Sequence, residues 1–362
     1  MTPGPVTSVQ PPVALSAYTT LGLGGPARRF VAAGTEAELV AEVRDADRRA
    51  EPLLVLGGGS NVVIADDGFD GTVVHVETSG VQIRAAGGGR VAVTAAAGES
   101  WDALVSRCVA GGLAGVECLA GIPGLVGATP IQNVGAYGQE IAQTVTSVRG
   151  YDRMTGETAE LTAADCGFGY RTSRFKRDPG RFVVLSATFA LTRDPRSRPV
   201  GYAELARRLG VAVGEQVPLA DARAAVLGLR RGKAMVLDPG DPDTRSAGSF
   251  FTNPVLTPGR FAAVEQAARA RFGPGVAVPR FPADDGQVKV PAAWLIERSG
   301  FARGYPAGAA VRISARHTLA LVHTGGGSTK ALLELAAQIR DGVRASFGVE
   351  LVPEPVLVGV RL

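Results

Sequence analysis

The chain has 362 residues, enough for two or three compact units with buried cores. Hydrophobic residues make up 46% of it and charged residues 20%, with both signs interspersed, which excludes a disordered chain. The net charge is +4, but no basic run is interleaved with aromatic residues, so nucleic-acid binding is not indicated. The three cysteines lack Cys-x-x-Cys spacing, which argues against disulfides and zinc and favours a reducing compartment.

The N-terminus and the hydropathy pattern predict a cytoplasmic protein. Residues 1–13 have no basic region followed by an apolar one, and we expect a short flexible leader there. No stretch reaches the roughly 18 apolar residues needed to cross a bilayer. We therefore expect a cytoplasmic protein with no membrane partner. We also expect it to be a monomer.

Alternating helix and strand signals predict an α+β fold. Thr35 and Glu38 form a capping-box pattern that begins a helix reaching about residue 46. Residues 111–138 carry too many glycines for one regular element and predict a long ordered loop, and the Pro/Gly/Asp-rich segment 238–243 predicts a domain boundary. In chain order, the other expected elements are strands over 53–56, 62–64, 72–76 and 91–95, a helix over 100–110, strands over 146–151 and 182–191, and helices over 203–209, 219–231, 259–272, 292–298 and 329–347.

The segment Gly57-Gly58-Gly59-Ser60-Asn61 presents consecutive backbone N–H groups with almost no side chain in the way, an arrangement that suits a pyrophosphate. An ordinary glycine turn is the alternative. The segment is not a Rossmann dinucleotide motif, because Val62 stands where the third glycine would be and no helix follows.

A second glycine-rich surface spans residues 121–138. Its polar pair Gln132-Asn133 and the following Gly135-Ala136-Tyr137-Gly138 could hydrogen-bond a cofactor that the glycines allow to approach. A purely structural Ω-loop is the alternative. Two such surfaces close together in the chain favour a dinucleotide ligand more than either does alone.

Other motifs do not fit common catalytic patterns. Residues 325–330 lack the residue order of a phosphate-binding P-loop, and Ser328 or Thr329 is predicted to be a helix N-cap. Ser249, in Ala-Gly-Ser-Phe-Phe, lacks the Gly-x-Ser-x-Gly turn of hydrolases, which argues against a catalytic triad. The three histidines show no metal-ligand spacing, so no metal is expected.

Four segments taken together resemble the UDP-N-acetylenolpyruvoylglucosamine reductase family. They occur in the order of the family, are followed by its closing Pro353-Glu354, and extend the resemblance from about Thr20 to the C-terminus. Tyr202 resembles the substrate-covering tyrosine of the subfamily that carries an extra loop. The four segments are Leu56–Asn61, Gly121–Gly138, Gly169-Tyr170-Arg171 and Ala247–Pro254.

The resemblance implies an α+β fold with a two-part FAD-binding domain of the vanillyl-alcohol-oxidase type and a smaller α+β substrate domain. Residues 1–75 would form the first FAD-binding subdomain, with residues 352–362 returning to it. Residues 76–232 would form the second subdomain, and residues 233–351 the substrate-binding domain.

The activity implied by the resemblance is reduction of UDP-N-acetyl-3-O-(1-carboxyvinyl)glucosamine to UDP-N-acetylmuramate, a step of peptidoglycan precursor synthesis. FAD and NADPH are the implied cofactors, and the partner is this nucleotide sugar. The residues expected to bind the cofactor are Gly57, Gly58, Gly59, Ser60, Asn61, Gly121, Ile122, Pro123, Gly124, Gly127, Gln132, Asn133, Gly135, Ala136, Tyr137 and Gly138.

Three residues match the catalytic positions of the family. Hydride addition sends negative charge into the substrate carboxylate, and Arg171 is expected to stabilise that charge, with Glu354 protonated or sharing a proton beside it. Ser249 is expected to protonate the resulting carbanionic carbon, a base strong enough to take a proton from a hydroxyl.

Five further residues are expected to contact the substrate. Arg230 and Lys233 end a predicted helix and match positions that meet the diphosphate, although a basic helix end that complements the helix dipole is the alternative. Asn253, Tyr170 and Tyr202 complete this set.

Two other functions remain open on the residues alone. An oxidase could use the same FAD fold with oxygen as electron acceptor, but the Ala-Gly-Ser-Phe-Phe segment and the closing Pro-Glu have no use in alcohol oxidation. A non-catalytic nucleotide-binding module would be indicated by a purified protein that is colourless and cannot bind FAD.

Overall fold

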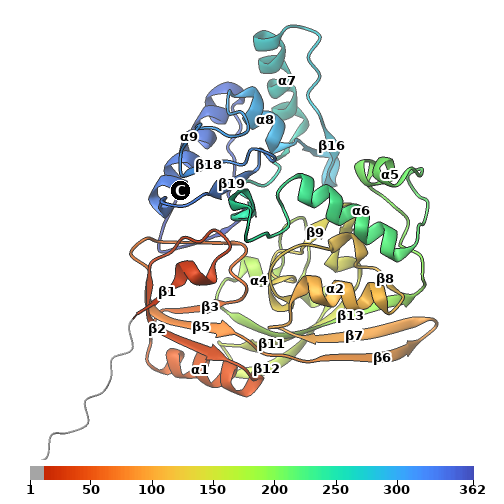
Figure 1. Cartoon of the computed structure of the whole chain (residues 1–362), viewed down its shortest axis with the longest axis vertical. Helices are drawn as coiled ribbons and strands as arrows, with labels where there is room; N and C mark the ends of the chain where they lie inside the picture. Colours follow the sequence, from red (N-terminus) through yellow and green to blue (C-terminus); the bar gives the residue numbers. More distant parts are fainter. Residues whose placement is uncertain (1–11) are drawn as a thin grey trace, which may run out of the picture.

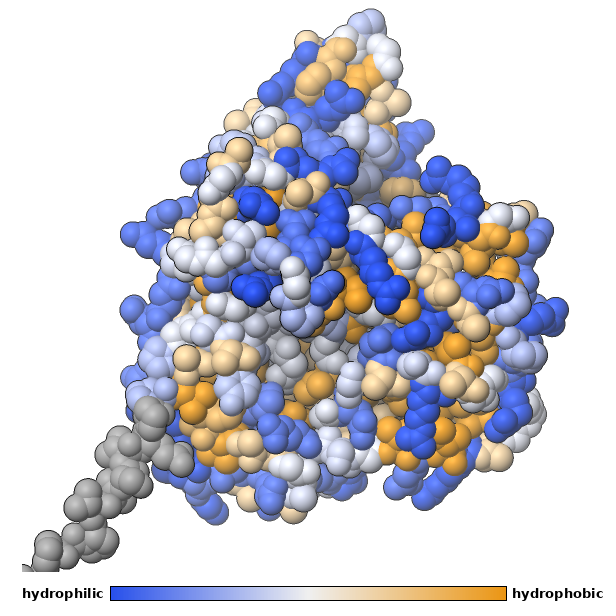
Figure 2. Space-filling model, viewed as in Figure 1, coloured by the Kyte–Doolittle hydropathy of each residue, from blue (hydrophilic) through white to orange (hydrophobic). Residues whose placement is uncertain are grey.

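The structure is a computed structural model that describes residues 12–362, and it consists of three packed parts (Figure 1). The leader expected over residues 1–13 lies outside the described residues, apart from its last two, and Val13 already begins β1. The face in view is hollowed between the upper part, which contains α9, and the two lower parts (Figure 2).

The first part is a four-stranded sheet in the order β1-β2-β5-β3, covered by α1. β5 lies between β2 and β3 and is parallel to both, and α1 is the crossover that parallel strands require. Leu39 and Val43 of α1 are fully buried in a core that also contains Val74 of β5. Thr35 and Glu38 form the predicted capping box. The bounds are β1 Val13–Ala14, β2 Pro26–Ala33, α1 Glu36–Arg48, β3 Leu53–Leu56 and β5 Phe69–Val76.

The second part is an antiparallel sheet in the order β12-β11-β13-β7-β6, in which β8 also pairs with β13. Trp101 of α2 packs against Phe189 of β13 with ring centroids 5.6 Å apart, so α2 covers this sheet. The bounds are β6 Val81–Gly87, β7 Arg90–Ala96, α2 Trp101–Ala110, β8 Leu113–Ala114, β9 Gly135–Ala136, β10 Gln139–Glu140, β11 Val145–Asp152, β12 Glu157–Thr162, α3 Ala163–Cys166, α4 Arg174–Arg177, β13 Phe182–Arg193, α5 Ala203–Leu209 and α6 Leu219–Gly232.

The third part has two small antiparallel sheets, β14-β19-β18 and β15-β17-β16, packed with three helices. Leu332 and Ile339 of α9 and Leu295 of α8 are fully buried in its core. The bounds are β14 Ser246–Ser249, β15 Val255–Leu256, α7 Pro258–Phe272, β16 Phe281–Pro282, β17 Val288–Lys289, α8 Ala292–Arg298, β18 Val311–Ile313, β19 Ala320–His323 and α9 Thr329–Phe347.

The C-terminal strand returns to the first part of the chain. β20 (Val356–Val358) pairs in parallel with β4 (Val62–Ile64), directly after the first glycine-rich loop. On the way it crosses the third part, where Phe251 and Pro353 form an antiparallel bridge. The end of the chain is thereby held between the first and third parts.

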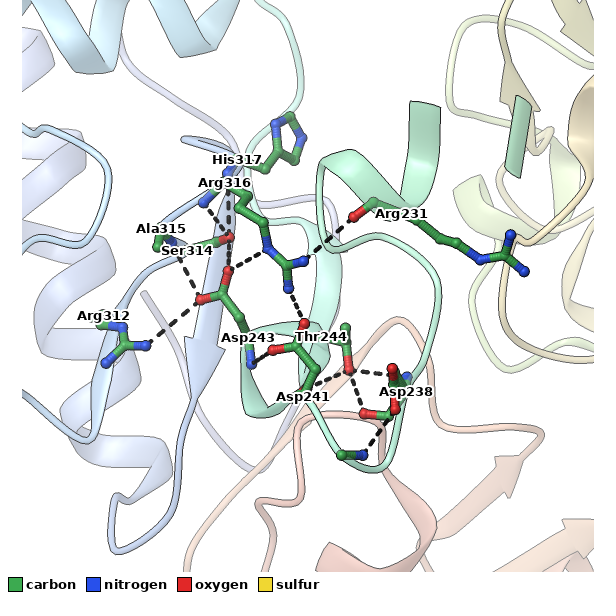
Figure 3. Close-up of polar contacts among 11 residues, drawn as sticks. Arg231, Asp238, Asp241, Asp243, Thr244, Arg312, Ser314, Ala315, Arg316 and His317 are labelled. Atoms are coloured by element: carbon green, nitrogen blue, oxygen red, sulfur yellow. Dashed lines mark hydrogen bonds and ion pairs between the residues drawn. The ribbon is translucent and has the colours of Figure 1, made fainter. Parts of the chain in front are cut away.

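The segment over residues 238–243, where a domain boundary was expected, is ordered by side-chain contacts (Figure 3). The Asp243 carboxylate accepts a hydrogen bond of 2.7 Å from the Ser314 hydroxyl and lies 3.4 Å from the Arg316 guanidinium. Arg316 also pairs with Asp241 and donates to the carbonyl oxygen of Arg231, at the end of α6. The segment therefore fastens α6 to the third part.

The predicted helices and strands are all present, with ends that differ by a few residues at most. Among the strands of four or more residues in the first two parts, β2, β6 and β12 were not predicted. β6 and β12 are the two edges of the second sheet and are mostly exposed, so their sequences lack the apolar alternation of half-buried strands.

A carboxylate from the first part caps the longest helix of the third part. The two oxygens of Asp66 accept hydrogen bonds of 2.7 and 2.9 Å from the backbone N–H groups of Thr329 and Lys330, at the start of α9. Ser328 is the N-cap residue, as predicted, and accepts from Ala331. This helix start is therefore already occupied by a carboxylate, which explains why residues 325–330 do not form a phosphate loop.

Replacing Asp66 by alanine removes an acceptor from two helix N–H groups, and we expect it to lower the free energy of unfolding by about 1 kcal/mol. Urea unfolding of Asp66→Ala and of the neighbouring Asp67→Ala measures the difference. Asp67→Ala should change the free energy by less than about 0.5 kcal/mol. Equal values for the two variants would show that the cap contributes nothing.

Candidate active site

The two predicted glycine-rich surfaces lie against each other. A Cβ atom on Gly58 would lie 2.9 Å from the Cα atom of Gly124, so the two backbones touch where neither carries a side chain. The Ser60 hydroxyl donates a hydrogen bond of 3.1 Å to the carbonyl oxygen of Pro123, and the Asn61 amide donates one of 2.8 Å to Gln132 Oε1. The two loops therefore form one continuous surface.

The first loop has backbone donors without acceptors. Within residues 12–362, no acceptor receives a hydrogen bond from the N–H groups of Gly58, Gly59, Ser60 or Asn61. Gly59 is buried, and buried N–H groups are nearly always paired. A run of such groups is the arrangement that binds anionic phosphate oxygens, so the loop fits the pyrophosphate of a dinucleotide.

Several residues of the predicted cofactor set have a structural role in these loops. Asn133 is only 1% exposed, and its amide donates to Glu140 and Gly169 and accepts from Ala142. A Cβ atom on Gly127 would lie 2.6 Å from the Cβ atom of Ala97. The N–H group of Gly121 donates a hydrogen bond to the Asp102 carboxylate. The Ile122 side chain packs against the hydrophobic core of the second part. These contacts shape the loop.

A tight hairpin projects one aromatic ring from the second loop. β9 and β10 pair antiparallel and are joined by Tyr137 and Gly138, whose φ angles are +49° and +85°. Two successive positive φ angles are typical of a type I′ turn. The Tyr137 ring meets the Tyr202 ring edge to face at 5.6 Å, and Lys233 Nζ lies 5.8 Å from its centroid.

A basic cluster surrounds this tyrosine pair. Lys233 forms a salt bridge of 2.7 Å with Glu204. Arg230 is 8% exposed and donates to the carbonyl oxygen of Met235, but its Nε has no partner within residues 12–362. Burial, and next the charges of Lys233 and Arg230, lower the pKa of His317 to about 4, so this histidine is neutral near pH 7. The cluster can therefore receive an anion.

Arg171 and Glu354 form an ion pair, with Arg171 Nε 3.3 Å from Glu354 Oε1. Arg171 Nη2 also donates a hydrogen bond of 2.7 Å to the carbonyl oxygen of Gly135. The φ angle of Arg171 is +51°, a left-handed conformation that is uncommon outside glycine. Burial raises the pKa of Glu354, and the positive charges of Arg171 and Lys176 oppose that rise. This carboxyl group therefore holds a proton more readily than an ordinary glutamate.

Ser249 lies at the end of β14, next to the segment that carries Glu354. It pairs with Ala320 of β19 and is half-buried. The carbonyl oxygen of the following residue, Phe250, accepts a hydrogen bond of 2.8 Å from the N–H group of Glu354. The backbone thus brings the serine and the Arg171–Glu354 pair into one region, although about 80 residues separate Ser249 from Arg171 in the sequence.

Tyr170 extends this region to the third part of the molecule. Lys289 Nζ lies 4.6 Å from the centroid of its ring, and the Arg171 guanidinium carbon lies 5.7 Å from it. Burial raises the pKa of Tyr170, and the positive charge of Arg171 is the largest of the effects that lower it. Asn253 Oδ1 accepts a hydrogen bond of 2.9 Å from the N–H group of Ala292. The predicted site residues thus form one group around Arg171 and another around Lys233.

Sequence reasoning did not select Lys176, Glu204 or Lys289, which contact the predicted residues. For Lys176 a signal existed, because it follows Arg171 by only five residues in the sequence. Glu204 and Lys289 gave none, since a single charged residue on a helix or strand is usually a solvated surface group.

Comparison with known proteins identifies the family. Residues 241–358 match the family model of the UDP-N-acetylenolpyruvoylglucosamine reductase C-terminal domain, and residues 27–162 match that of an FAD binding domain. A UDP-N-acetylenolpyruvoylglucosamine reductase from Thermobifida fusca is 58% identical over 98% of this chain and 99% of its own length. This chain belongs to the UDP-N-acetylenolpyruvoylglucosamine reductase family. A relative of the same name from Streptomyces coelicolor is 55% identical over 96% of this chain and 90% of its own.

Membership in the reductase family confirms the predicted family, the FAD cofactor, the class of enzyme and its place in peptidoglycan synthesis. It favours these over a sugar oxidase or a non-catalytic module. The crystal structure of UDP-N-acetylenolpyruvylglucosamine reductase from Thermus caldophilus has a TM-score of 0.66 and 24% identity, and the match covers 96% of this chain and 98% of that one. It confirms the predicted α+β fold.

Within residues 12–362, no helix combines the length and apolar composition that a membrane crossing requires.

The glycines of the first loop differ in what they contribute, and two alanine variants separate these contributions. A Cβ atom on Gly59, where φ is +58°, would lie 1.9 Å from the carbonyl oxygen of Tyr18, whereas one on Gly57 would meet only the Leu125 side chain at 3.5 Å. We expect Gly59→Ala to lower the free energy of unfolding of the apoprotein by about 2 kcal/mol or more. Gly57→Ala should change it by less than about 0.5 kcal/mol.

Urea unfolding of the apoprotein measures both values, and titration with FAD then measures cofactor affinity. If the loop binds the cofactor, Gly57→Ala lowers that affinity while the apoprotein keeps its stability. Equal stability of the two apoprotein variants would contradict the close approach at Gly59.

Proposed function

We propose that this chain reduces UDP-N-acetyl-3-O-(1-carboxyvinyl)glucosamine to UDP-N-acetylmuramate, with NADPH as the reductant. The observation that carries this proposal is the hydrogen bond between Phe250 and Glu354, because it brings the strand of Ser249 beside the Arg171–Glu354 ion pair. A carboxylate-binding arginine and a hydroxyl in one region suit a reaction that builds up negative charge on a carboxylate and then protonates carbon.

FAD would be held by the two touching glycine-rich loops. The N–H groups of Gly58, Gly59, Ser60 and Asn61, which have no acceptor within residues 12–362, would bind its pyrophosphate, and the residues predicted over 121–138 would line the rest. When bound, FAD supplies the hydride that reduces the substrate, having received it from NADPH in an earlier half-reaction.

Arg171 would bind the substrate carboxylate, to which a guanidinium can donate two parallel hydrogen bonds. Glu354 pairs with Arg171, so an ionised Glu354 would compete with the substrate for that guanidinium. The raised pKa of Glu354 favours its protonated form, which leaves the positive charge of Arg171 for the substrate.

Ser249 would donate a proton to the carbon next to the substrate carboxylate. A serine hydroxyl is a weak acid, but a carbanionic carbon is a strong base, so the transfer is favourable once negative charge has arrived. Ser249 is half-buried at the end of β14, so it is not enclosed in the core.

The second group of residues would hold the diphosphate and sugar. Arg230 and Lys233 lie together beside Tyr137 and Tyr202, and Tyr202 is 40% exposed, as a residue that covers an incoming ligand must be before it binds. Asn253 and Tyr170 would contact the substrate nearer to Arg171.

The division of the chain belongs to the same proposal. Residues 1–75 with 352–362, and residues 76–232, would form the two FAD-binding subdomains, and residues 233–351 the substrate-binding domain. The parallel pairing of β20 with β4 supports the return of the C-terminus. We also propose that the protein acts as a cytoplasmic monomer, and light scattering of the purified holoenzyme tests the monomeric state.

Ser249→Ala should still allow NADPH to bleach the flavin, but should slow substrate-dependent reoxidation of the flavin by about 10²-fold to 10⁴-fold, the usual loss on removing a general acid. Anaerobic stopped-flow absorbance measures both half-reactions. Ser299→Ala, at the end of α8, is the matched control and should leave both rates unchanged. Equal slowing of both half-reactions in Ser249→Ala would remove the serine from proton donation.

The rate of substrate-dependent reoxidation should fall as pH rises through the pKa of Glu354, because the ionised carboxylate competes for Arg171. Since burial raises this pKa, the fall should lie above the ordinary glutamate range. Glu354→Gln is neutral at every pH and should lose this pH dependence. A Glu354→Gln profile with the same fall would assign the titration to another group.

A further inference from the structure

We propose that Lys176 is a further residue of this active site, whose ammonium group adds a second positive charge to the Arg171–Glu354 pair and stabilises the doubly negative form of the reacting substrate. The inference rests on the proposed roles of Arg171, Glu354 and Ser249. It extends them to a residue that touches Arg171 from a different element.

Lys176 lies on α4, the short helix that follows Arg171. Its Nζ donates a hydrogen bond of 3.2 Å to the backbone carbonyl oxygen of Arg171. Arg171 is in the left-handed conformation, and its guanidinium contacts the Gly135 carbonyl oxygen and Glu354. The ammonium group is thus hydrogen-bonded to the backbone of the residue that would bind the substrate carboxylate.

The side chain of Lys176 is half-buried. Within residues 12–362, no carboxylate lies within salt-bridge distance of it, in contrast to Lys233, which is paired with Glu204. A charge removed from water without a partner is costly, and proteins usually neutralise it. Burial accordingly lowers the pKa of Lys176, and the charge of Arg171 lowers it further, against an opposing effect of Glu354. Arg171 and Lys176 nevertheless place two basic groups beside the single carboxyl group of Glu354.

Lys176 is not needed to build its own helix. Ser173 caps α4, is fully buried, and donates a hydrogen bond of 2.5 Å to the carbonyl oxygen of Ile131. Phe175 is buried in the hydrophobic core of the second part, and the centroid of its ring lies 5.8 Å from that of Phe182. Because these residues anchor the segment, loss of the Lys176 ammonium group should leave the fold intact.

The charges match the chemistry of the reaction. The substrate carboxylate carries one negative charge. Hydride adds to the methylene carbon with its electron pair, the carbon–carbon π pair moves to the neighbouring carbon and its carboxylate, and the reacting group then carries two negative charges. The two-electron reduction of the substrate is balanced by oxidation of the reduced flavin. The O–H bond of Ser249 then breaks, its proton forms the new C–H bond, and solvent returns a proton to the serine.

Arg171 and a protonated Glu354 offer one positive charge at this stage. Lys176 supplies a second positive charge, so two cationic groups stabilise the reacting group at the stage when its negative charge is greatest. The effect is therefore larger on the reacting form than on the bound substrate or product. This asymmetry distinguishes Lys176 from a residue that merely helps binding.

The test uses the FAD-loaded holoenzyme and three variants: Lys176→Met, Lys176→Arg and the exposed control Lys330→Met on α9. In anaerobic stopped-flow, Lys176→Met should slow substrate-dependent flavin reoxidation about tenfold or more, while NADPH-dependent bleaching stays within about twofold of the unmodified protein. Lys176→Arg keeps the charge and should recover most of the rate. A Lys176→Met rate equal to that of Lys330→Met, or an equal loss in both half-reactions, would overturn the proposal.

The pH profile gives a readout that a structural role would not move. The charged groups facing Glu354 are Arg171 and Lys176, with Tyr170 also adjacent. Since Lys176 lowers the pKa of Glu354, its removal should shift the fall in reoxidation rate to higher pH even though the rate itself is smaller. Lys176→Arg should restore the original position. An unshifted profile in Lys176→Met would contradict an electrostatic role.

Calorimetric binding of UDP-N-acetylmuramate to the oxidised holoenzyme separates binding from reaction. Lys176→Met should weaken this binding by a smaller factor than it slows reoxidation, and equal factors would reduce Lys176 to a binding residue. Arg171→Met distinguishes the two proposals. If it leaves reoxidation unchanged, the proposed function fails, whereas if it slows reoxidation and Lys176→Met does not, only the role of Lys176 fails.

Discussion

The parallel pairing of β20 with β4 is the constraint on which the site depends. Val356 donates a hydrogen bond of 2.9 Å to the carbonyl oxygen of Asn61, the last residue of the first glycine-rich loop. Two residues earlier, Glu354 is held against Phe250 and faces Arg171. A shift of β20 by one residue would turn the Glu354 side chain to the other face of the strand and leave Arg171 without its partner. One strand therefore aligns the cofactor loop, the ion pair and the segment of the serine.

Positive charge in the site is divided between two places with different counter-ions. Around Arg171, the carboxyl group of Glu354 has a raised pKa and Lys176 has no carboxylate partner within the described residues, so this region favours an incoming negative charge. Around Lys233, Glu204 neutralises one cation, while the Nε atom of buried Arg230 has no partner in the part of the chain that the structure describes. A nucleotide sugar with a carboxylate at one end and a diphosphate at the other matches this division. Since both regions are partly shielded from water, these charges act more strongly than surface pairs do.

Glycine has two separate uses in the cofactor loops. At Gly58, Gly59 and Gly127 the missing side chain allows protein to touch protein, because a Cβ atom would lie within 3 Å of a neighbouring atom. At Gly57 a Cβ atom would meet only a leucine side chain at ordinary contact distance, so close protein contact does not account for the glycine there. The same distinction applies to Asn133, whose amide is fully used inside the loop. A glycine-rich motif therefore identifies a ligand surface without identifying which of its residues touch the ligand.

The sequence by itself determined the family, the α+β fold, the longer helices and several inner strands, because caps, apolar periodicity and the order of short motifs are local properties of the chain. It did not reveal the edge strands β6 and β12, since exposed strands lack an apolar pattern. Only the tertiary structure decided which charged groups meet. The contact of Glu354 with Arg171, of Lys233 with Glu204 and of Asp66 with α9 joins residues far apart in sequence. These contacts depend on strand register and on how the parts pack, which no local pattern records.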